Sequence, residues 1–383
     1  MRWVNNYSAW VEINLDNIIF NMQKLRGKVG PDIKIMAIVK ANGYGHGLCE
    51  IGHTVLESGA DFLGVATIYE AIKLRQSGIK VKIFLTNAVL PEQIDEIIKW
   101  DITPFVYDIK LVKALDAELK KASKKISVHV KIDTGMGRLG LAPENFLDFI
   151  TELQSLKNLN FEGVLTHFAQ SDDEEYTDFQ LERFNVIINK AYKRGITFTY
   201  IHCANSAALL RCPDTYFNIV RPGISIYGLY PCVKLQNKIE LRPAMKVKAK
   251  IIFVKNVPIG TSISYGRTFL TSRPSVIATI PVGYADGYSR ILSNKGEVIV
   301  SKRRVRVVGT VCMDSFMIDV TEVPDIKTGD EVTLLGREGD EEISAEELAM
   351  KTGTINYEIV SNIGDRLPRV YLKSQEVVKE EYL

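Results

Sequence analysis

Up to about residue 230, short apolar runs alternate with longer amphipathic segments, and this alternation restricts the fold more than any other feature of the sequence. The pattern is typical of repeated βα units and predicts a parallel sheet. Eight βα units in about 230 residues fit a closed β/α barrel of the TIM type, which needs roughly 250 residues. An open, doubly wound sheet is the alternative. The predicted strands are residues 35–39, 62–66, 82–85, 103–107, 127–132, 161–167, 199–203 and 218–220.

The sequence changes character after Pro231. Long helical patterns stop, and β-rich runs separated by Gly, Pro, Asn and Asp predict a mainly β second domain. One helix is expected there, because residues 344–347 (SAEE) resemble a capped helix start. We therefore place a barrel domain at residues 1–240 and a mainly β domain at residues 241–383. The predicted strands of the second domain are residues 245–254, 275–280, 298–300, 306–311, 316–320 and 331–335.

The charge balance argues against a polyanionic partner. Lys and Arg number 48 and Asp and Glu 46, so the formal net charge of +2 gives little attraction for nucleic acid or an anionic membrane. No stretch approaches the roughly 18 apolar residues of a membrane span, and no signal peptide pattern is seen. The five cysteines lack C-x-x-C spacing and no H-E-x-x-H motif occurs, so we expect a cytoplasmic protein without a dedicated metal site. A small molecule is the expected partner.

Ionisable side chains occur where several of the predicted strands end. In β/α barrels the active site forms at the carboxyl ends of the strands and in the loops that follow them. Taken singly, a lysine at a strand end usually faces solvent, and a lone histidine is usually a hydrogen-bonded core group. Their coincidence at one face of a barrel favours a reactive site. The residues are Lys40, Lys131 with Arg138 in the loop after it, His167, His202 and Arg221.

Lys40 is the natural nucleophile of this set. A lysine at the mouth of an apolar barrel is desolvated, which favours the neutral amine that can form a Schiff base with a carbonyl. Phosphate binding is indicated by Asn205–Ser206, which can cap a short helix, and by Gly223–Ile224, where glycine lets an anion approach the backbone. These loops follow the seventh and eighth strands, where barrels commonly bind phosphate. A Schiff-base lysine with a phosphate site suggests pyridoxal 5′-phosphate.

Residues 37–47, AIVKANGYGHG, resemble the cofactor-lysine signature of the alanine racemases. Matching stretches continue through both predicted domains, so the resemblance covers essentially the whole chain. They are residues 131–140 (KIDTGMGRLG), 166–168 (THF), 205–208 (NSAA), 221–224 (RPGI), 264–269 (SYGRTF), 281–288 (PVGYADGY), 312–314 (CMD) and 355–358 (INYE).

The resemblance implies a barrel and a β domain assembled as a head-to-tail homodimer, in which each active site takes residues from both chains. It implies that Lys40 holds pyridoxal 5′-phosphate and that His167 lies against the pyridine ring. Arg138 is implied to approach the phenolic oxygen of the cofactor or the substrate carboxylate. The residues implied around the phosphate are Tyr44, Ser206, Gly223, Ile224 and Tyr357.

The implied reaction is the interconversion of L-alanine and D-alanine through a pyridoxal phosphate aldimine, which supplies D-alanine for bacterial cell wall synthesis. Removing the α-proton on one face and returning a proton on the other favours two opposed bases. The resemblance assigns these roles to Lys40 and to Tyr265 of the partner subunit. We expect Arg221 to bond His202 and His202 to reach Tyr265. Because Arg221 only donates, it would also keep the pyridine nitrogen unprotonated.

Lys131 is expected to be carbamylated. A second ammonium beside Arg138 would repel it, whereas a carbamate would hold that guanidinium by charge-assisted hydrogen bonds. An unmodified lysine paired with Asp133 is the alternative.

Three other activities fit parts of the pattern. A pyridoxal phosphate carrier of the single-barrel type would share the lysine motif and the phosphate site, but the β domain argues against it. An amino acid decarboxylase with the same organisation would use other catalytic groups. A broad-specificity racemase would act on larger substrates, whereas Tyr357, Tyr284 and Met313 are implied to crowd the side chain and favour alanine.

Overall fold

The computed structural model describes residues 6–236 and 238–381, which form two compact units. The barrel unit comprises residues 18–43 and 48–242, and the β unit comprises residues 6–17, 44–47 and 243–381. The sequence predicts a single boundary near residue 240. It does not anticipate that the first strand of the chain and the segment Tyr44–Gly47 belong with the β unit.

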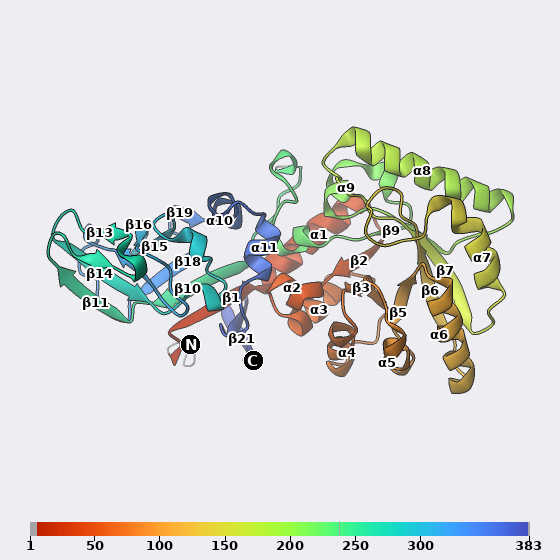
Figure 1. The fold of residues 1–383 in the computed structure, drawn as a ribbon, viewed down its shortest axis with the longest axis horizontal. Coiled ribbons are helices and arrows are strands. Elements are labelled where there is room, and N and C mark those ends of the chain that lie inside the picture. The colour runs from red at the N-terminus through yellow and green to blue at the C-terminus, as the bar shows by residue number, and fades with distance from the viewer. Residues whose placement is uncertain (1–5, 237, 382–383) are drawn as a thin grey trace. The chain divides into compact units, whose positions relative to one another are not determined.

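Eight parallel strands form the sheet of the barrel unit, in the order β8-β7-β6-β5-β4-β3-β2-β9 (Figure 1). Strands β2 to β8 lie side by side in chain order and β9 pairs with β2, which is the order of a barrel and excludes the doubly wound alternative. The Arg221 amide, just after β9, donates to the Ala204 carbonyl oxygen, just after β8, at 2.9 Å. This hydrogen bond joins the two edges of the sheet, so the barrel is nearly closed. The strands are β2 Lys34–Ile38, β3 Phe62–Val65, β4 Ile83–Leu85, β5 Thr103–Val106, β6 Ile126–Lys131, β7 Leu159–Leu165, β8 Tyr200–His202 and β9 Ile219–Val220.

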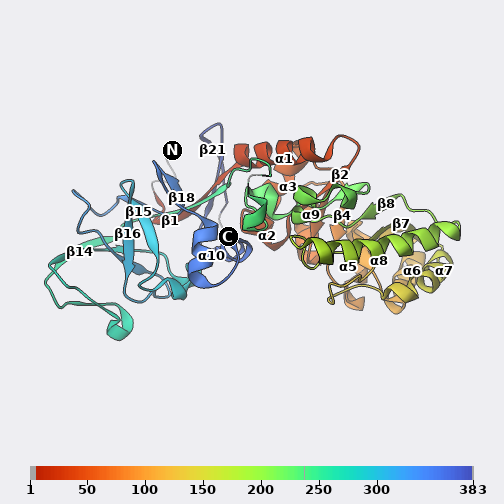
Figure 2. The same cartoon turned by 90° about the horizontal axis from the view of Figure 1, so that it is seen from above.

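Helices connect these strands and lie outside them (Figures 1 and 2). In α6, Val112, Leu115 and Leu119 recur at helical spacing and are buried. The Asp173 carboxylate caps α8 by accepting from the Tyr176 amide at 2.9 Å. No helix among the described residues combines the length and apolar character needed to cross a membrane. The helices are α1 Leu15–Val29, α2 Lys40–Tyr44, α3 Leu48–Glu57, α4 Ile68–Gln76, α5 Ile94–Trp100, α6 Ile109–Ala122, α7 Phe146–Gln154, α8 Glu174–Lys193 and α9 Ser206–Arg211.

The β unit is built on an 11-stranded sheet whose main path runs β11-β14-β17-β16-β15-β18-β10-β1-β20-β21 (Figure 1). This confirms the predicted mainly β domain. Strand β1 pairs antiparallel with β10 and parallel with β20, and the sequence does not predict it. The run predicted as one strand at residues 245–254 is two strands, because β10 pairs with β18 and β11 pairs with β14.

The elements of the β unit are as follows. The strands are β1 Ala9–Asn14, β10 Met245–Lys250, β11 Phe253–Val257, β12 Ser262–Ile263, β13 Phe269–Leu270, β14 Ser275–Ile280, β15 Glu297–Val300, β16 Arg303–Val308, β17 Phe316–Asp319, β18 Glu331–Glu338, β19 Glu341–Ile343, β20 Arg369–Lys373 and β21 Glu376–Glu381. The helices are α10 Ala345–Thr352 and α11 Asn356–Ser361.

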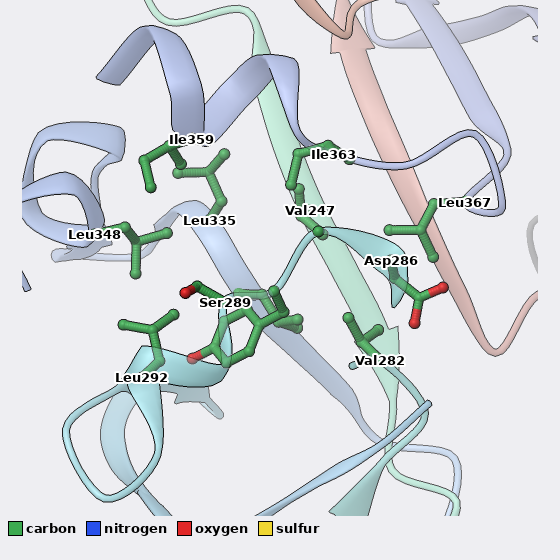
Figure 3. A pocket seen from close by; sticks show the side chains of 13 residues that line it. Val247, Val282, Asp286, Ser289, Leu292, Leu335, Leu348, Ile359, Ile363 and Leu367 are labelled. Atoms are coloured by element: carbon green, nitrogen blue, oxygen red, sulfur yellow. The ribbon is translucent and has the colours of Figure 1, made fainter. Parts of the chain in front are cut away.

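Helices α10 and α11 pack on one face of this sheet. Leu348 of α10 and Ile359 of α11 line a small apolar cavity together with Leu335 of β18 (Figure 3). The Ser344 side chain accepts from the Glu347 amide at 3.0 Å, which confirms the predicted capped start of α10. This packing fixes α11, which carries one of the predicted phosphate-site residues.

Candidate active site

Lys40 lies just after β2 and begins α2, which is a strained left-handed turn and not a regular helix. Ala41, Asn42 and Gly43 have φ angles of 53°, 53° and 61°, so three successive residues lie in the left-handed region, which residues with a Cβ rarely adopt. The turn is held by Asn42 Oδ1, which accepts from the Leu48 amide at 2.9 Å. It therefore fixes the Lys40 backbone at the carboxyl end of a barrel strand, as predicted.

Two lysines of the barrel unit have environments that favour their neutral amines. Burial, reinforced by the charge of Arg138, lowers the pKa of Lys40, while Glu70 acts in the opposite direction. Burial, with the charges of Arg138 and Arg221, lowers the pKa of Lys131 to about 8. Each amine therefore loses its proton more readily than an exposed lysine. The neutral amine is the nucleophilic form that the chemistry predicted for Lys40 requires.

Arg138 completes a group of cations at this end of the barrel. It is exposed, in the loop after β6, where Asp133 Oδ1 accepts from the amides of Gly135 at 2.9 Å and Gly137 at 3.1 Å. Its charge acts on both Lys40 and Lys131. Cations gathered in this way favour an anionic ligand.

Arg221 is buried, and its donors are directed at fixed acceptors. Nη1 lies 2.8 Å from Nδ1 of His202, and Nη2 lies 3.2 Å from Nδ1 of His167. Nη2 also donates to the carbonyl oxygens of Thr166 at 2.8 Å and Cys203 at 3.0 Å. Burial lowers the pKa of Arg221 to about 10, so the side chain is still a cation at neutral pH. The bonds hold it between the ends of three strands.

His202 has a second partner that the sequence does not predict. Its Nε2 lies 2.8 Å from Nδ1 of His129, whose own Nε2 lies 3.3 Å from Glu162 Oε2. Because His202 is fully buried and both of its ring nitrogens are engaged inside the barrel, the expectation that it reaches Tyr265 is corrected. His129 lies two residues before Lys131 on β6, so strand alternation places both side chains on one face. That alternation is the signal that could have identified His129.

The predicted phosphate-site residues of the barrel unit meet after β8 and β9. Asn205 Oδ1 caps α9 with two hydrogen bonds of 3.1 Å from the first turn, as the sequence predicts. Ser206 Oγ accepts from the Gly223 amide at 2.8 Å, which leaves the hydroxyl hydrogen able to donate. Ser206, Gly223 and Ile224 are all buried. The arrangement offers the Ser206 hydroxyl as a donor of the kind that binds phosphate oxygens, beside the backbone of Gly223 and Ile224.

Tyr44 and Tyr357, the other two predicted phosphate-site residues, lie together in the β unit. Their ring centroids are 6.2 Å apart with an interplanar angle of 49°. Burial raises the pKa of Tyr44, so its phenol keeps the proton that a hydrogen bond to phosphate would use.

Three further predicted residues are exposed on the β unit. The exposed fractions are 73% for Tyr265, 54% for Met313 and 43% for Tyr284. They are linked through the backbone around residues 310–313, because Thr310 Oγ1 donates to the Tyr265 carbonyl oxygen at 2.8 Å and the Ala285 amide donates to the Met313 carbonyl oxygen at 3.1 Å. Large apolar side chains exposed together are typical of a surface that contacts another molecule.

The chain matches two protein-family models. Residues 13–231 match "Alanine racemase, N-terminal domain" and residues 244–371 match "Alanine racemase, C-terminal domain". Among curated relatives, the alanine racemase of Desulforamulus reducens is 46% identical over 367 residues, which cover 95% of this chain and 98% of that protein. The alanine racemase of Methanococcus maripaludis is 43% identical over 371 residues, which cover 96% of this chain and 99% of that protein.

Solved structures agree with the observed fold. The alanine racemase of Clostridium difficile 630 superposes with a TM-score of 0.95 at 40% identity, covering 98% of this chain and 99% of that one. The alanine racemase of Bacillus anthracis with bound L-Ala-P gives 0.93 at 37% identity, covering 98% and 97%. The alanine racemase of Bartonella henselae with covalently bound pyridoxal phosphate gives 0.86 at 30% identity, covering 96% and 100%.

Proposed function

The chain belongs to the alanine racemase family, and we propose that it interconverts L-alanine and D-alanine with pyridoxal 5′-phosphate as its cofactor. The observation that carries the proposal is the position of Lys40 at the carboxyl end of β2, where burial and the charge of Arg138 lower its pKa. The guanidinium groups of Arg138 and Arg221 at the same end of the barrel suit a ligand that carries anionic groups. The lowered pKa of Lys40 suits covalent attachment of a carbonyl cofactor.

The described residues fit this cofactor. Lys40 would hold it covalently, Arg221 would face the pyridine nitrogen and His167 would lie against the ring. Burial, with the charge of Arg221, holds the pKa of His167 well below its usual range, so its ring stays neutral. The phosphate would be bound by Tyr44, Ser206, Gly223, Ile224 and Tyr357. When bound, the cofactor supplies an electron sink that stabilises charge at the α-carbon of an amino acid.

Two bases on opposite faces of the substrate would move the α-proton. Lys40 can accept a proton on one face, because burial favours its neutral amine. We assign the other face to Tyr265 of the partner subunit, a residue that is 73% exposed within a single chain. Arg138 would hold the substrate carboxylate or the phenolic oxygen of the cofactor.

Arg221 constrains the chemistry through its own hydrogen bonds. A guanidinium has no acceptor, and this one stays charged at neutral pH. Arg221 would therefore bind the pyridine nitrogen of the cofactor only as an unprotonated acceptor. Arg221 would thereby weaken the electron withdrawal that the cofactor supplies and favour return of the proton over side reactions.

We further propose a head-to-tail homodimer. The barrel unit, which corresponds to the domain predicted at residues 1–240, would bind the cofactor, and the domain predicted at residues 241–383 would complete the partner's active site. The exposure of Tyr265, Tyr284 and Met313 supports this, because an apolar group that is exposed in one chain is available to another.

The product would be the D-alanine that bacterial cell wall synthesis consumes. All five cysteines are free, as is usual for proteins of the reducing cytoplasm, and we propose that compartment.

Chiral chromatography of L-alanine incubated with the cofactor-loaded protein tests the proposal. We expect a racemate. Unchanged L-alanine would indicate a carrier protein, and release of the amine would indicate a decarboxylase. Comparison across several L-amino acids would separate a racemase for alanine from one of broad specificity.

A further inference from the structure

A continuous chain of polar side chains crosses the interior of the barrel. It starts at Arg221, passes through His202 and His129, and ends at Glu162, with successive separations of 2.8, 2.8 and 3.3 Å. Glu162 in turn accepts from Lys82 Nζ at 2.6 Å. The chain thus links Arg221, at the carboxyl ends of the strands, to an ion pair on the far side of two buried imidazoles.

The chemistry of the groups fixes the direction of every hydrogen bond. Arg221 can only donate, so Nδ1 of His202 must accept and carries no hydrogen. A neutral His202 then holds its hydrogen on Nε2 and donates to Nδ1 of His129. His129 likewise holds its hydrogen on Nε2 and donates to the Glu162 carboxylate. Both rings therefore have one defined tautomer.

The surroundings keep both imidazoles neutral. Each is fully buried, and burial is the main cause that lowers the pKa of His129 and holds that of His202 well below its usual range. The charged groups that act on the two rings are Arg221, Glu162 and Lys82. Burial alone would raise the pKa of Glu162, but the bonds from His129 and Lys82 lower it to about 2, so the chain ends in a carboxylate.

The local backbone is shaped to admit the His129 ring. The pairing of β6 with β7 shifts register at Val128/His129, so that Gly163 instead of Glu162 lies opposite His129. A Cβ at Gly163 would lie 2.7 Å from Cε1 and Nδ1 of His129, which is closer than real Cβ atoms approach. Gly163 is therefore required for this ring position, while Glu162 remains free to meet Nε2.

Aromatic rings enclose the chain from the other strands. The centroid of the His129 ring lies 4.7 Å from that of Phe84, 6.2 Å from that of Phe105 and 5.8 Å from that of Tyr200. An apolar enclosure strengthens hydrogen bonds and makes an unpaired polar atom costly. The imidazoles are therefore held to each other rather than to water.

We propose that His129 and Glu162 are positioning residues for racemisation, because their hydrogen bonds hold the His202 ring through its Nε2 hydrogen, in the orientation in which Nδ1 accepts from Arg221, and so orient Arg221. This inference rests on the proposed function, in which Arg221 faces the pyridine nitrogen. His129 touches neither substrate nor cofactor in this role. It acts through His202, and Glu162 acts through His129.

The tautomers can be measured without the cofactor. In the ¹⁵N-labelled, cofactor-free chain, long-range ¹H–¹⁵N correlation spectra should show a hydrogen on Nε2 alone for His129 and His202, unchanged from about pH 6 to about pH 9. The His129→Phe variant assigns the signals. A hydrogen on Nδ1 of His202, or a charged imidazole within this pH range, would contradict the hydrogen-bond directions from Arg221 to Glu162 and overturn the proposal.

The role in catalysis is tested with the loaded enzyme. His129→Phe keeps an aromatic ring in the barrel interior but removes the acceptor for the Nε2 hydrogen of His202. We therefore expect kcat to fall roughly tenfold, the size expected when a buried hydrogen bond loses one partner. The KM for alanine should change by less than about threefold, because substrate contacts are retained. The matched control is Phe105→Leu, which alters packing beside both imidazoles without changing a hydrogen bond, and its kcat should stay within about twofold of wild type.

Each outcome decides the proposal. An unchanged kcat in folded His129→Phe, or an equal loss in Phe105→Leu, would overturn it. If wild type itself fails to racemise alanine, the proposed function fails. The tautomers measured in the cofactor-free protein still decide whether the series of hydrogen bonds from Arg221 to Glu162 exists. If His129→Phe does not fold, the signals of both imidazoles are assigned with Phe105→Leu, because the Phe105 ring lies beside both, and their tautomers then decide the matter.

Discussion

Carbamylation of Lys131 is the prediction whose size follows most directly from the structure. With the pKa of this amine lowered from 10.5 to about 8, about 10% of it is neutral at pH 7, compared with about 0.03% for an ordinary lysine. Only the neutral amine attacks carbon dioxide, forming the N–C bond and releasing a proton to solvent. The environment of Lys131 therefore raises the supply of the reactive form by a factor of roughly 300.

The carbamate would hold Arg138 through a hydrogen bond between charged groups, which is worth about 1.5–3 kcal/mol. If that energy is lost when Lys131 is replaced by Ala, kcat/KM should fall roughly 10- to 150-fold. A small carboxylate such as acetate should restore part of the activity by occupying the same place. Lys125→Ala removes an exposed lysine near the start of β6 and is the matched control, with no expected loss.

The assay is ¹³C NMR of the cofactor-loaded protein in ¹³C-bicarbonate near pH 8. Wild type should show a carbamate resonance that Lys131→Ala lacks and Lys125→Ala retains. Activity measured in parallel should fall after carbon dioxide is removed and return when bicarbonate is added. A wild-type protein without the resonance, and with activity that does not respond to bicarbonate, would refute the reasoning and leave Lys131 as an unmodified amine.

Four further predictions concern single residues. Lys40→Ala should abolish racemisation and the covalent cofactor link; borohydride reduction followed by peptide mass spectrometry would contradict this if it found the cofactor on another lysine. Mixing inactive Lys40→Ala and Tyr265→Ala subunits should restore part of the activity, because each heterodimer has one intact site; no recovery after proven subunit exchange would count against the shared site. Gly163→Ala should lower thermal stability and displace His129, since the added Cβ would lie 2.7 Å from the ring, and a variant as stable as wild type with unchanged imidazole signals would disprove the clash. Because the pKa of Glu162 is lowered from 4.5 to about 2 on folding, its contribution to stability is present above about pH 4.5 and is lost as the pH falls toward 2. Circular dichroism should therefore show that Glu162→Gln weakens the fold at neutral pH but reduces its acid sensitivity in that window, and an identical acid titration would exclude the effect.

The barrel could be predicted from the sequence because its signals are local. Each strand is a short apolar run, each amphipathic helix follows it directly, and Lys40 stands at the end of the first predicted strand. The Asn205 cap and the Ser344 cap are also local, since each side chain bonds to an amide within three residues. Predictions of this kind need no knowledge of distant partners.

The missed features depend on pairing between distant segments. Strand β1 is stable because Ala9–Asn14 pairs with β10 and β20, more than two hundred residues away. Its own sequence does not predict this pairing. The run at residues 245–254 (MKVKAKIIFV) shows no break in its β pattern, yet the chain exchanges one partner strand for another near Ile251 and Ile252, where their amides donate to the carbonyl oxygens of Asp330 and Thr279.

The second bond of His202 was missed for the same reason. A sequence places His202 at a strand end but does not say which side chain of another strand meets its Nε2. That partner depends on the register of β6 against β7, which shifts at Val128/His129. The register between the strands therefore decides whether His202 faces the substrate or lies inside the barrel, where it accepts from Arg221.

The equilibrium reached from both enantiomers tests the central claim most directly. L-alanine and D-alanine have equal free energies in water, so a racemase must bring either one to the same equal mixture. Incubation of the cofactor-loaded protein with pure L-alanine and, separately, with pure D-alanine should give a 1:1 ratio by chiral chromatography, with deuterium from D₂O at the α-carbon of the product enantiomer. Conversion in one direction only, a product other than alanine, or inverted alanine without α-deuterium would contradict the account.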